Sequence, residues 1–263
     1  MEECFVTDNH PPETAPQITA VTLDRHRHVR VQRQEDYAHA ARSHVSPLVV
    51  AEFASAASDY PIVLIKDGET GSFRAAALFG LGPGENVYSS PQGWNATYVP
   101  MNVSRYPFVI GLDESDGATP CLCIDEASDR LSSSGDGDPL FDAQGAETPF
   151  LSAARQQMQR LYEGEQQTQA FIAAILGLRL ITPLHLKVSL ADGANRQVTG
   201  LYGVAQDRLE HLADADLIAL CRDRHMLALH AMLISQRQLN RLAQLHNAQT
   251  APAIVQIALQ SQD

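Results

Sequence analysis

The 263-residue chain lacks long apolar runs, a disulfide framework and a recognisable catalytic signature. A membrane-spanning helix needs roughly 18 or more apolar residues in a row, and no run approaches that length, so no membrane span is expected. The first residues, MEECFVTDNHPPETAPQ, hold neither a basic nor an apolar stretch, which argues against a secretory signal. We therefore expect a soluble, cytoplasmic protein.

Cysteine is scarce, and the four cysteines show no spacing typical of a disulfide scaffold. Cys121 and Cys123 are two residues apart in an expected strand, so their side chains share one face. A zinc site would need a second close pair of ligands, and neither Cys4 nor Cys221 supplies one. Buried free thiols are the expectation, because free cysteine often behaves as a small apolar residue.

Catalytic and metal-binding motifs are also missing. The ten histidines form no H-E-x-x-H and no H-x-[DE] pattern, and the chain has no C-x-x-C and no G-x-S-x-G. His26 and His28 could share a strand face and reach a metal together with a distant carboxylate, but no complete ligand set is present. We expect no catalytic residue, no cofactor and no stoichiometric transition metal, which favours a protein that is not an enzyme.

Two loop-like segments resemble ligand-binding motifs only in part. GLGPGEN, Gly80 to Asn86, reads G-x-G-x-G, whereas a dinucleotide loop reads G-x-G-x-x-G and opens a helix. Asp136, Asp138 and Asp142 resemble the start of a calcium loop that lacks its central glycine. A glycine-rich turn and a solvated acidic loop are the expected structures.

Charge is concentrated in one part of the chain. The formal net charge is -12, and residues 113–147 hold ten acidic residues and one basic residue. A nucleic-acid partner would need a basic footprint. The only candidate is RHRHVRVQR, Arg25 to Arg33, which is too short to outweigh the rest. We expect no binding to nucleic acid.

Three segments share one local pattern that predicts β-hairpins. In each, a proline precedes an apolar run, an acidic and glycine-containing turn follows, and a second apolar run returns. The segments are Ile62–Leu81, Phe108–Ile124 and Leu184–Val204. They predict about six strands in one mainly antiparallel sheet system. The fold class is then α+β, with a hairpin-rich sheet in the N-terminal half and helices plus one further hairpin in the C-terminal half.

Helices are expected around these hairpins. Ser46 and Pro47 suit the start of a helix that ends near Asp59. Thr148 and Pro149 suit the start of another, which Gly164 should separate from a further helix that ends at Leu178. A longer helix is expected over 226–245.

Composition further suggests a linear division of the chain. The expected parts are a flexible leader (1–20), a β-rich region (21–131), an acidic linker (132–147), a mixed helical region with a hairpin (148–246) and a polar tail with one small apolar patch (247–263).

Cationic and aromatic residues near the predicted strand ends are the best candidates for a binding surface. Guanidinium groups stack on rings and fork onto carboxylates, so such pairs are common in recognition. The alternative is a structural ion pair or cation–π contact that closes the sheet. For Arg105 the structural role is favoured, and for Trp94 recognition is favoured. The candidate binding residues are Arg30, Lys66, Glu85, Asn86, Trp94, Tyr98, Arg105 and Tyr106.

A string of motifs resembles the SapC family of bacterial proteins. The motifs cover roughly residues 25 to 245 and occur in order. Members of that family often carry a second arginine before the RYPF motif, where this chain has Ser104. The motifs are HRHVRV (His26–Val31), VAEFASAASDYPIVLIKD (Val50–Asp67), LFGLGPGENVY (Leu78–Tyr88), GWNATYVP (Gly93–Pro100), RYPF (Arg105–Phe108), PLFD (Pro139–Asp142), TPFL (Thr148–Leu151), PLHLKVSLADG (Pro183–Gly193) and GLYGV (Gly200–Val204).

The resemblance implies an association with the bacterial surface layer. It also implies neighbouring flavin-dependent halogenase-like and cupin-like proteins as partners. No catalytic residues of the family carry over to this chain. The leading hypothesis is an accessory protein that binds a protein or peptide client through its β-rich half during export or modification of surface proteins. The alternative is a metal-dependent oxygenase that works with a flavoprotein.

Overall fold

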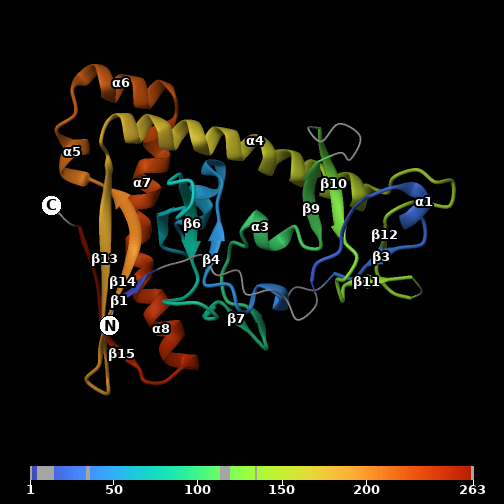
Figure 1. The fold of residues 1–263 in the computed structure, drawn as a ribbon, viewed down its shortest axis with the longest axis horizontal. Helices are drawn as coiled ribbons and strands as arrows, with labels where there is room; N and C mark the ends of the chain where they lie inside the picture. The colour runs from blue at the N-terminus through green and yellow to red at the C-terminus, as the bar shows by residue number, and fades with distance from the viewer. Residues whose placement is uncertain (1, 5–14, 34–35, 113–118, 134, 262–263) are drawn as a thin grey trace. The chain divides into compact units, whose positions relative to one another are not determined.

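The computed structural model describes residues 2–4, 15–33, 36–112, 119–133 and 135–261 (Figure 1). The chain has an α+β fold and divides into two compact units. The first unit comprises Met1–Asn9, Ala38–Pro100 and Gly164–Asp263. The second comprises His10–Tyr37 and Met101–Glu163. Each unit is therefore assembled from segments that are distant in the sequence.

A seven-stranded sheet forms the framework of the first unit. Six strands lie in the order β15-β13-β14-β5-β6-β4, and β1 pairs with β14 beside this path. Only the β1–β14 pair is parallel among these pairs. The strands are β1 (Glu2–Cys4), β4 (Val45–Pro47), β5 (Ile62–Lys66), β6 (Phe73–Leu78), β13 (Ile181–Leu190), β14 (Asn195–Val204) and β15 (Ile254–Ser261).

Alternation of apolar and polar residues gives this sheet one buried face. In β13, Leu184, Leu186 and Val188 are buried while the residues between them are half-buried or exposed. Helices α7 (His225–Ser235) and α8 (Leu239–Gln249) contact the sheet in the same unit (Figure 1). The side chain of Ser235 at the end of α7 accepts a hydrogen bond from the Ile62 backbone N–H at 2.9 Å. This bond ties the helix to the first residue of β5.

The second unit contains two small antiparallel sheets. One has the order β2-β10-β9 and the other the order β11-β3-β12. Their strands are β2 (Ile18–Ala20), β3 (Arg30–Val31), β9 (Phe108–Leu112), β10 (Pro120–Asp125), β11 (Leu131–Ser132) and β12 (Asp138–Pro139).

The remaining elements are short apart from one helix, α4. They are α1 (Leu23–His26), η1 (Ala38–Ala40), η2 (Val50–Glu52), α2 (Phe53–Ala56), β7 (Ser89–Ser90), β8 (Gly93–Trp94), α3 (Met101–Ser104), α4 (Pro149–Gly177), α5 (Gln206–Glu210), α6 (Asp214–Arg222) and η3 (Gln236–Gln238). Within the described ranges, no helix is both long and apolar enough to cross a bilayer.

All three predicted hairpins are confirmed. β5 pairs with β6, β9 with β10, and β13 with β14, each in antiparallel register. The prediction of a single sheet system is wrong, because β9 and β10 belong to a separate three-stranded sheet. The local Pro–apolar–turn pattern specifies a hairpin, but it does not specify which other strand the hairpin joins.

The predicted helix over residues 46–59 begins later than expected. Ser46 and Pro47 belong to β4, which pairs with β6, and helical structure starts only at Val50. Proline is tolerated there because β4 is the last strand in the sheet order. The same dipeptide suits a helix start or an edge strand, and pairing with β6 decides between them.

The prediction that Gly164 ends a helix is also wrong. The start is confirmed, since α4 begins at Pro149 and the Thr148 side chain accepts the Leu151 backbone N–H at 3.3 Å. The helix then runs through Gly164 without a break to Gly177. A Cβ at position 164 would lie 2.8 Å from the Cβ of Val49. Glycine at 164 therefore permits close packing rather than helix termination.

Three segments expected to be irregular contain ordered structure. The predicted tail includes β15, which pairs with β13, and the predicted linker includes the buried residues Leu140 and Phe141. The predicted leader includes β2 and β1, and its residues 5–14 lie outside the described ranges. The helix expected over 226–245 is divided into α7, η3 and α8. The predicted linear domain boundaries stay a prediction.

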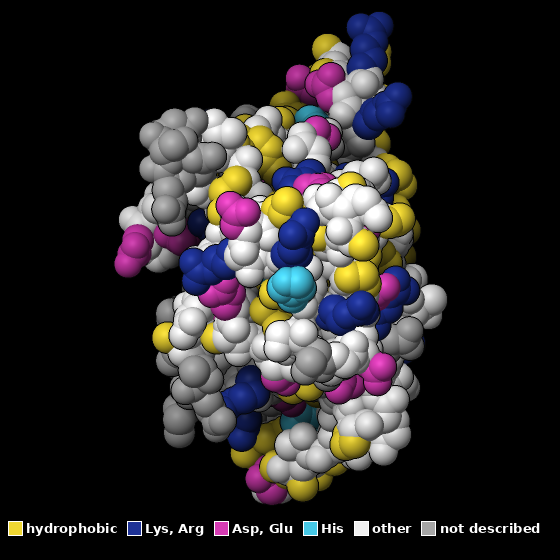
Figure 2. Space-filling model, turned by 90° about the vertical axis from the view of Figure 1, so that its right-hand side faces the viewer, with side chains coloured by type: hydrophobic (Ala, Val, Ile, Leu, Met, Phe, Trp, Pro, Cys, Tyr) yellow, Lys and Arg dark blue, Asp and Glu magenta, His cyan; other side chains and the backbone are white. Residues whose placement is uncertain are grey.

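Positive and negative side chains are interspersed on the face drawn in Figure 2. In the second unit, three arginines pair with carboxylates: Arg25 with Glu126 at 2.5 Å, Arg33 with Asp138, and Arg155 with Glu147 at 2.6 Å. The arginine side chains are 48–73% exposed, so solvent screens these ion pairs strongly.

Substitution of Gly164 tests the close packing against Val49. Alanine should favour the helix by about 0.5–1 kcal/mol, but the clash with Val49 should cost about 1–3 kcal/mol. Gly164→Ala should therefore lower the free energy of unfolding, measured by urea denaturation.

Gly177→Ala is the matched control, because nothing lies within 4 Å of a Cβ at that helical position. This variant should be neutral or slightly more stable. In a Val49→Ala background the penalty of Gly164→Ala should largely disappear. An equal loss of stability from Gly164→Ala with and without the Val49→Ala change would contradict the close packing of Gly164 against Val49.

Candidate functional site

A buried group of aromatic and charged residues lies in the first unit, just before β5. We call it the Tyr60 cluster. It draws on three of the sequence motifs, those containing DYP (Asp59–Pro61), Tyr88 and GWNATYVP (Gly93–Pro100), and on helix α8. Its members are Glu52, Asp59, Tyr60, Tyr88, Trp94, Tyr98 and Arg241.

Tyr60 is the centre of the cluster. Its side chain is fully buried, and its hydroxyl accepts a hydrogen bond from the Trp94 indole N–H at 2.7 Å. The same hydroxyl donates to the backbone carbonyl of Tyr98. The Tyr60 ring packs against the rings of Tyr88 (centroids 4.7 Å apart) and Phe79 (5.2 Å). Burial raises the pKa of Tyr60 well above its ordinary value, so its phenol stays protonated and can serve as a donor.

Two carboxylates are buried beside these rings. Glu52 and Asp59 are 3% and 2% exposed, values that ionisable side chains rarely show unless they are paired or hydrogen-bonded. Glu52 accepts the Tyr98 hydroxyl at 2.7 Å and the Val49 backbone N–H at 3.1 Å. Asp59 accepts the Tyr98 backbone N–H at 2.9 Å. Both carboxylates are therefore held by donors on fixed backbone positions.

Arg241 brings a positive charge to Asp59 from helix α8. One guanidinium nitrogen, Nη1, lies 3.8 Å from Asp59 Oδ1, and Nη2 donates to the Asn95 carbonyl at 2.9 Å. Its Nε is buried and has no hydrogen-bond partner among the described residues. The Arg241 side chain is 38% exposed, so solvent screens much of this ion pair.

The phenols of the cluster are poised to donate hydrogen bonds. Burial, followed by the nearby Glu52 carboxylate, raises the pKa of Tyr98. Burial also raises the pKa of Tyr88, whose hydroxyl donates to the Asp59 carbonyl at 2.8 Å. The hydroxyls of Tyr60, Tyr88 and Tyr98 all donate to protein groups, so the arrangement orients the loop that carries Trp94.

The candidate residues on the first unit are only partly brought together. Trp94 and Tyr98 both contact Tyr60. Lys66 lies exposed at the end of β5, with its Nζ 5.7 Å from the centroid of the Phe73 ring.

Glu85 and Asn86 have structural partners in the glycine-rich turn. Glu85 accepts the Leu81 backbone N–H at 2.7 Å and pairs with His246 at 2.5 Å. Asn86 is buried, donates to the Ala40 carbonyl at 2.7 Å and accepts the Tyr88 N–H at 3.0 Å. These bonds hold the segment Gly80–Asn86 in a turn, which is the structure expected for it from the sequence.

The other three candidates lie in the second unit. Arg30 donates to the Gly137 carbonyl at 2.9 Å. Arg105 donates to Asn102 Oδ1 at 3.1 Å and to the Phe108 carbonyl at 2.6 Å, and burial lowers its pKa. The ring of Tyr106 lies 5.3 Å from the guanidinium carbon of Arg130. The binding roles of all eight candidates stay predictions.

Sequence reasoning missed most of the Tyr60 cluster. Glu52, Asp59 and Tyr60 stand in one of the matched motifs, beside a strongly apolar run, and that position could have signalled burial. Arg241 had no such signal, because only the fold brings α8 to the DYP motif. Trp94, expected to serve recognition, is half-buried and donates to Tyr60. This bond gives Trp94 a structural contact in addition to its predicted role.

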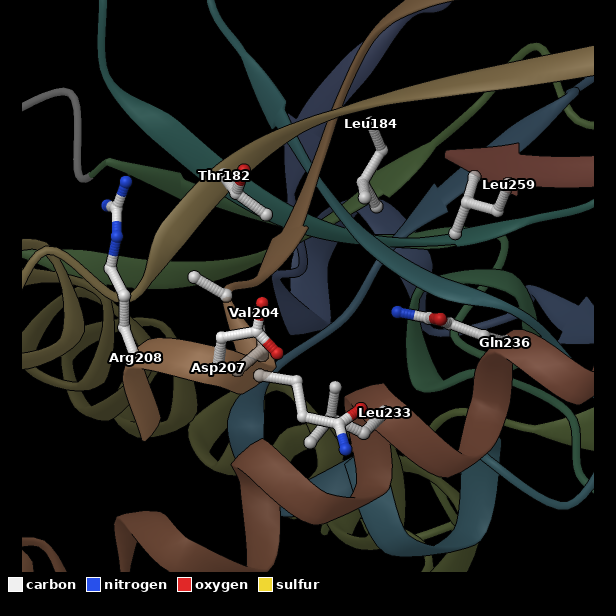
Figure 3. A pocket seen from close by; sticks show the side chains of 10 residues that line it. Thr182, Leu184, Val204, Asp207, Arg208, Leu233, Gln236 and Leu259 are labelled. Atoms are coloured by element: carbon white, nitrogen blue, oxygen red, sulfur yellow. The ribbon is translucent and has the colours of Figure 1, made fainter. Parts of the chain in front are cut away.

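A pocket of about 290 Å³ lies elsewhere in the first unit, between the sheet and helices α5 and α7 (Figure 3). Its apolar wall comes from three strands and α7: Leu184, Val204, Leu259 and Leu233. Its polar rim comes mainly from α5 and η3: Thr182, Gln206, Asp207, Arg208 and Gln236. Polar groups therefore make up a larger part of this lining than the few that line a typical ligand pocket.

Among the residues that the structure describes, no group of three or more His, Cys, Asp or Glu side chains is arranged to hold a metal ion. The Tyr60 cluster offers hydrogen-bond donors and packed rings, and the pocket offers a mixed polar and apolar lining.

Tyr98→Phe tests the support that the cluster gives to the buried Glu52. The change removes the hydroxyl that donates to Glu52, and losing a donor to a buried acceptor costs about 1–3 kcal/mol. The free energy of unfolding should fall by that amount in urea denaturation. Tyr162→Phe is the control, since that ring is 39% exposed, and it should cost under about 0.5 kcal/mol. Equal free energies of unfolding for the two variants would show that the hydrogen bond from Tyr98 to Glu52 does not stabilise the fold.

Arg105→Ala tests the structural role expected for this arginine. Its two hydrogen-bond acceptors lose a buried donor, so the free energy of unfolding should fall by about 1–3 kcal/mol. Arg160→Ala, at an exposed position on α4, should change stability by less than about 0.5 kcal/mol. The melting temperatures of both variants, measured by calorimetry, distinguish a structural role of Arg105 from a role in recognition. An unchanged melting temperature for Arg105→Ala would instead favour a role in recognition.

Comparison with known proteins supplies the family. No curated protein and no solved structure matches the chain. The SapC family model matches residues 22–242, which is most of the chain and includes both the Tyr60 cluster and the pocket-lining helix α7. The order of motifs along the sequence agrees with this match. The chain belongs to the SapC family.

Proposed function

We propose that this SapC-family chain is an accessory protein that binds an extended peptide segment of a client protein. The peptide adds as a further strand to the edge of β15, and one of its apolar side chains enters the neighbouring pocket. The single observation that carries the proposal is an uncharged edge strand that also contributes an apolar side chain, Leu259, to the lining of a pocket.

β15 has the features of an edge that accepts another strand. Among the described residues it pairs only with β13, at the end of the strand order. Its sequence, IVQIALQS, contains no charged residue and no proline. Natural edge strands are usually protected by charges, prolines or bulges. The one irregularity in its pairing lies opposite Ser189–Leu190, at the beginning of the strand.

The pocket adds side-chain selectivity to this edge. Leu259 of β15 lines it together with Leu184 of the neighbouring strand β13 and Leu233 of α7 (Figure 3). In strand addition, backbone hydrogen bonds provide affinity and pockets for alternate side chains provide specificity. The apolar wall fits an aliphatic or aromatic side chain. The rim residues Asp207 and Arg208 can pair with polar or charged groups of the flanking peptide residues.

Export or modification of surface proteins would present such segments. A client that is not yet folded exposes extended apolar segments, and these pair readily with an open edge. Involvement of flavin-dependent halogenase-like or cupin-like partners is compatible with this role, because an accessory protein can hold a segment for another enzyme.

Selection of short peptides from a displayed library against the whole chain tests the proposal. The selected peptides should carry apolar residues at alternate positions. Their binding should slow amide hydrogen exchange in β15, because a new strand covers its outer edge. Leu233→Trp should fill the pocket and weaken peptide binding at least tenfold, equivalent to about 1.4 kcal/mol.

Leu227→Trp is the matched control, because Leu227 lies on the same helix and is 67% exposed. It should leave peptide affinity unchanged. The proposal fails if the selected peptides protect no amide of β15, or if the two tryptophan variants bind them equally well.

A further inference from the structure

The second hairpin, β9–β10, belongs to the second unit (Figure 1). It carries two thiols that lie close together. Cys121 and Cys123 are on the same face of β10, and their sulfur atoms are 3.6 Å apart. Neither cysteine is in a disulfide; Cys121 is half-buried and Cys123 is 5% exposed. This pair is independent of the proposed peptide site, which lies in the first unit.

A glycine on the neighbouring strand makes room for the two sulfurs. Gly111 of β9 pairs with Cys121, and Val109 pairs with Cys123. A Cβ at position 111 would lie 2.4 Å from the Cys123 sulfur and 3.7 Å from the Cys121 sulfur. Any larger residue at 111 would therefore displace the Cys123 thiol from its present position beside the Cys121 thiol.

The strand geometry disfavours a disulfide between these cysteines. Side chains two residues apart in a strand have Cα and Cβ atoms roughly 6.4–6.8 Å apart, whereas a disulfide needs Cβ atoms about 3.5–4.5 Å apart. β10 is held extended on both sides, since Cys123 also pairs with Ala20 of β2. Closing the disulfide would require the central strand of this sheet to buckle. The geometry therefore disfavours a Cys121–Cys123 disulfide.

The same geometry suits one ion held between the two sulfurs. With metal–sulfur bonds of about 2.3 Å, a sulfur–sulfur distance of 3.6 Å corresponds to an angle of about 103° at the ion. That angle needs no movement of the strand. Two thiolates are too few for a structural zinc site, which takes four ligands. Soft thiolate ligands bind monovalent copper, zinc and iron–sulfur clusters, and of these monovalent copper is the one that accepts two or three ligands.

We propose that Cys121 and Cys123 form a two-sulfur site for a soft, thiophilic ion of the monovalent copper class, with Gly111 providing the space. Each thiol loses its proton when the ion binds, and a ligand from solution completes the coordination. A stoichiometric ion here would correct the sequence-based expectation of no transition metal, which rested on histidine sets and on the absence of a second cysteine pair.

The test uses the full chain with Cys4 and Cys221 changed to Ser, reduced and stripped of metal, so that only the two thiols remain. Titration with monovalent copper against a chromophoric chelator, without oxygen, should give one copper ion per chain. Cys121→Ser and Cys123→Ser should each weaken copper binding by about a hundredfold or more, because the second sulfur acts at high effective concentration.

Phenylarsine oxide provides an independent covalent probe. The arsenic forms two bonds to sulfur, while its oxygen leaves with the two thiol protons as water, so nothing is oxidised or reduced. Intact mass should show one adduct per chain, and both thiols should then resist a maleimide. Two adducts per chain, or one adduct with a thiol still reactive, would show that the sulfurs do not act together.

Gly111→Ala separates the geometry of the pair from the mere presence of two thiols. Both thiols remain in this variant, but copper affinity should fall at least tenfold. Gly68→Ala, where no atom lies within 4 Å of the added Cβ, should bind copper normally. Unchanged affinity in Gly111→Ala or in either single serine variant would overturn the proposal. So would ready formation of a Cys121–Cys123 disulfide with oxidised glutathione.

Discussion

The pairing of β14 with β5 is the constraint on which the first unit depends. Only two residue pairs are in register, Leu201 with Ile65 and Tyr202 with Leu64. They join a hairpin from the N-terminal half to a hairpin from the C-terminal half. Without this connection, each hairpin would expose an apolar face, and an isolated two-stranded hairpin is only marginally stable in water. Together they form a continuous sheet whose buried face packs against α7 and α8.

This connection also explains why polar groups are buried beside β5. Asp59 and Tyr60 immediately precede the strand, and the helices that follow β14 bring Arg241 to them. Burying Asp59 is tolerated because backbone and side-chain donors surround it. Such a network permits fewer alternative arrangements than an all-apolar core would. The Tyr60 cluster thereby fixes the loop that carries Trp94.

The two proposals use different consequences of β-structure. The peptide proposal depends on the backbone N–H and C=O groups along the edge of β15, a strand that contains no charged residue. On β10, the dithiol proposal depends on the rule that side chains two residues apart share a face. The peptide site needs a free edge, whereas the dithiol site needs a strand held on both sides. Each proposal can therefore fail while the other stands.

The sequence by itself determined the three hairpins, the start of α4 at Thr148–Pro149, and the family. Each depends on residues that are close together in the chain: a proline, an apolar run, a turn or a cap. Tertiary structure decided the rest. Gly164 is a contact rather than a helix end because Val49 lies against it, and the predicted tail is a strand because β13 has a free edge to pair with. Likewise, Arg241 joins the Tyr60 cluster only because α8 packs in the same unit as the DYP motif. Contacts between residues distant in sequence leave no local pattern, so they could be recognised only in the folded chain.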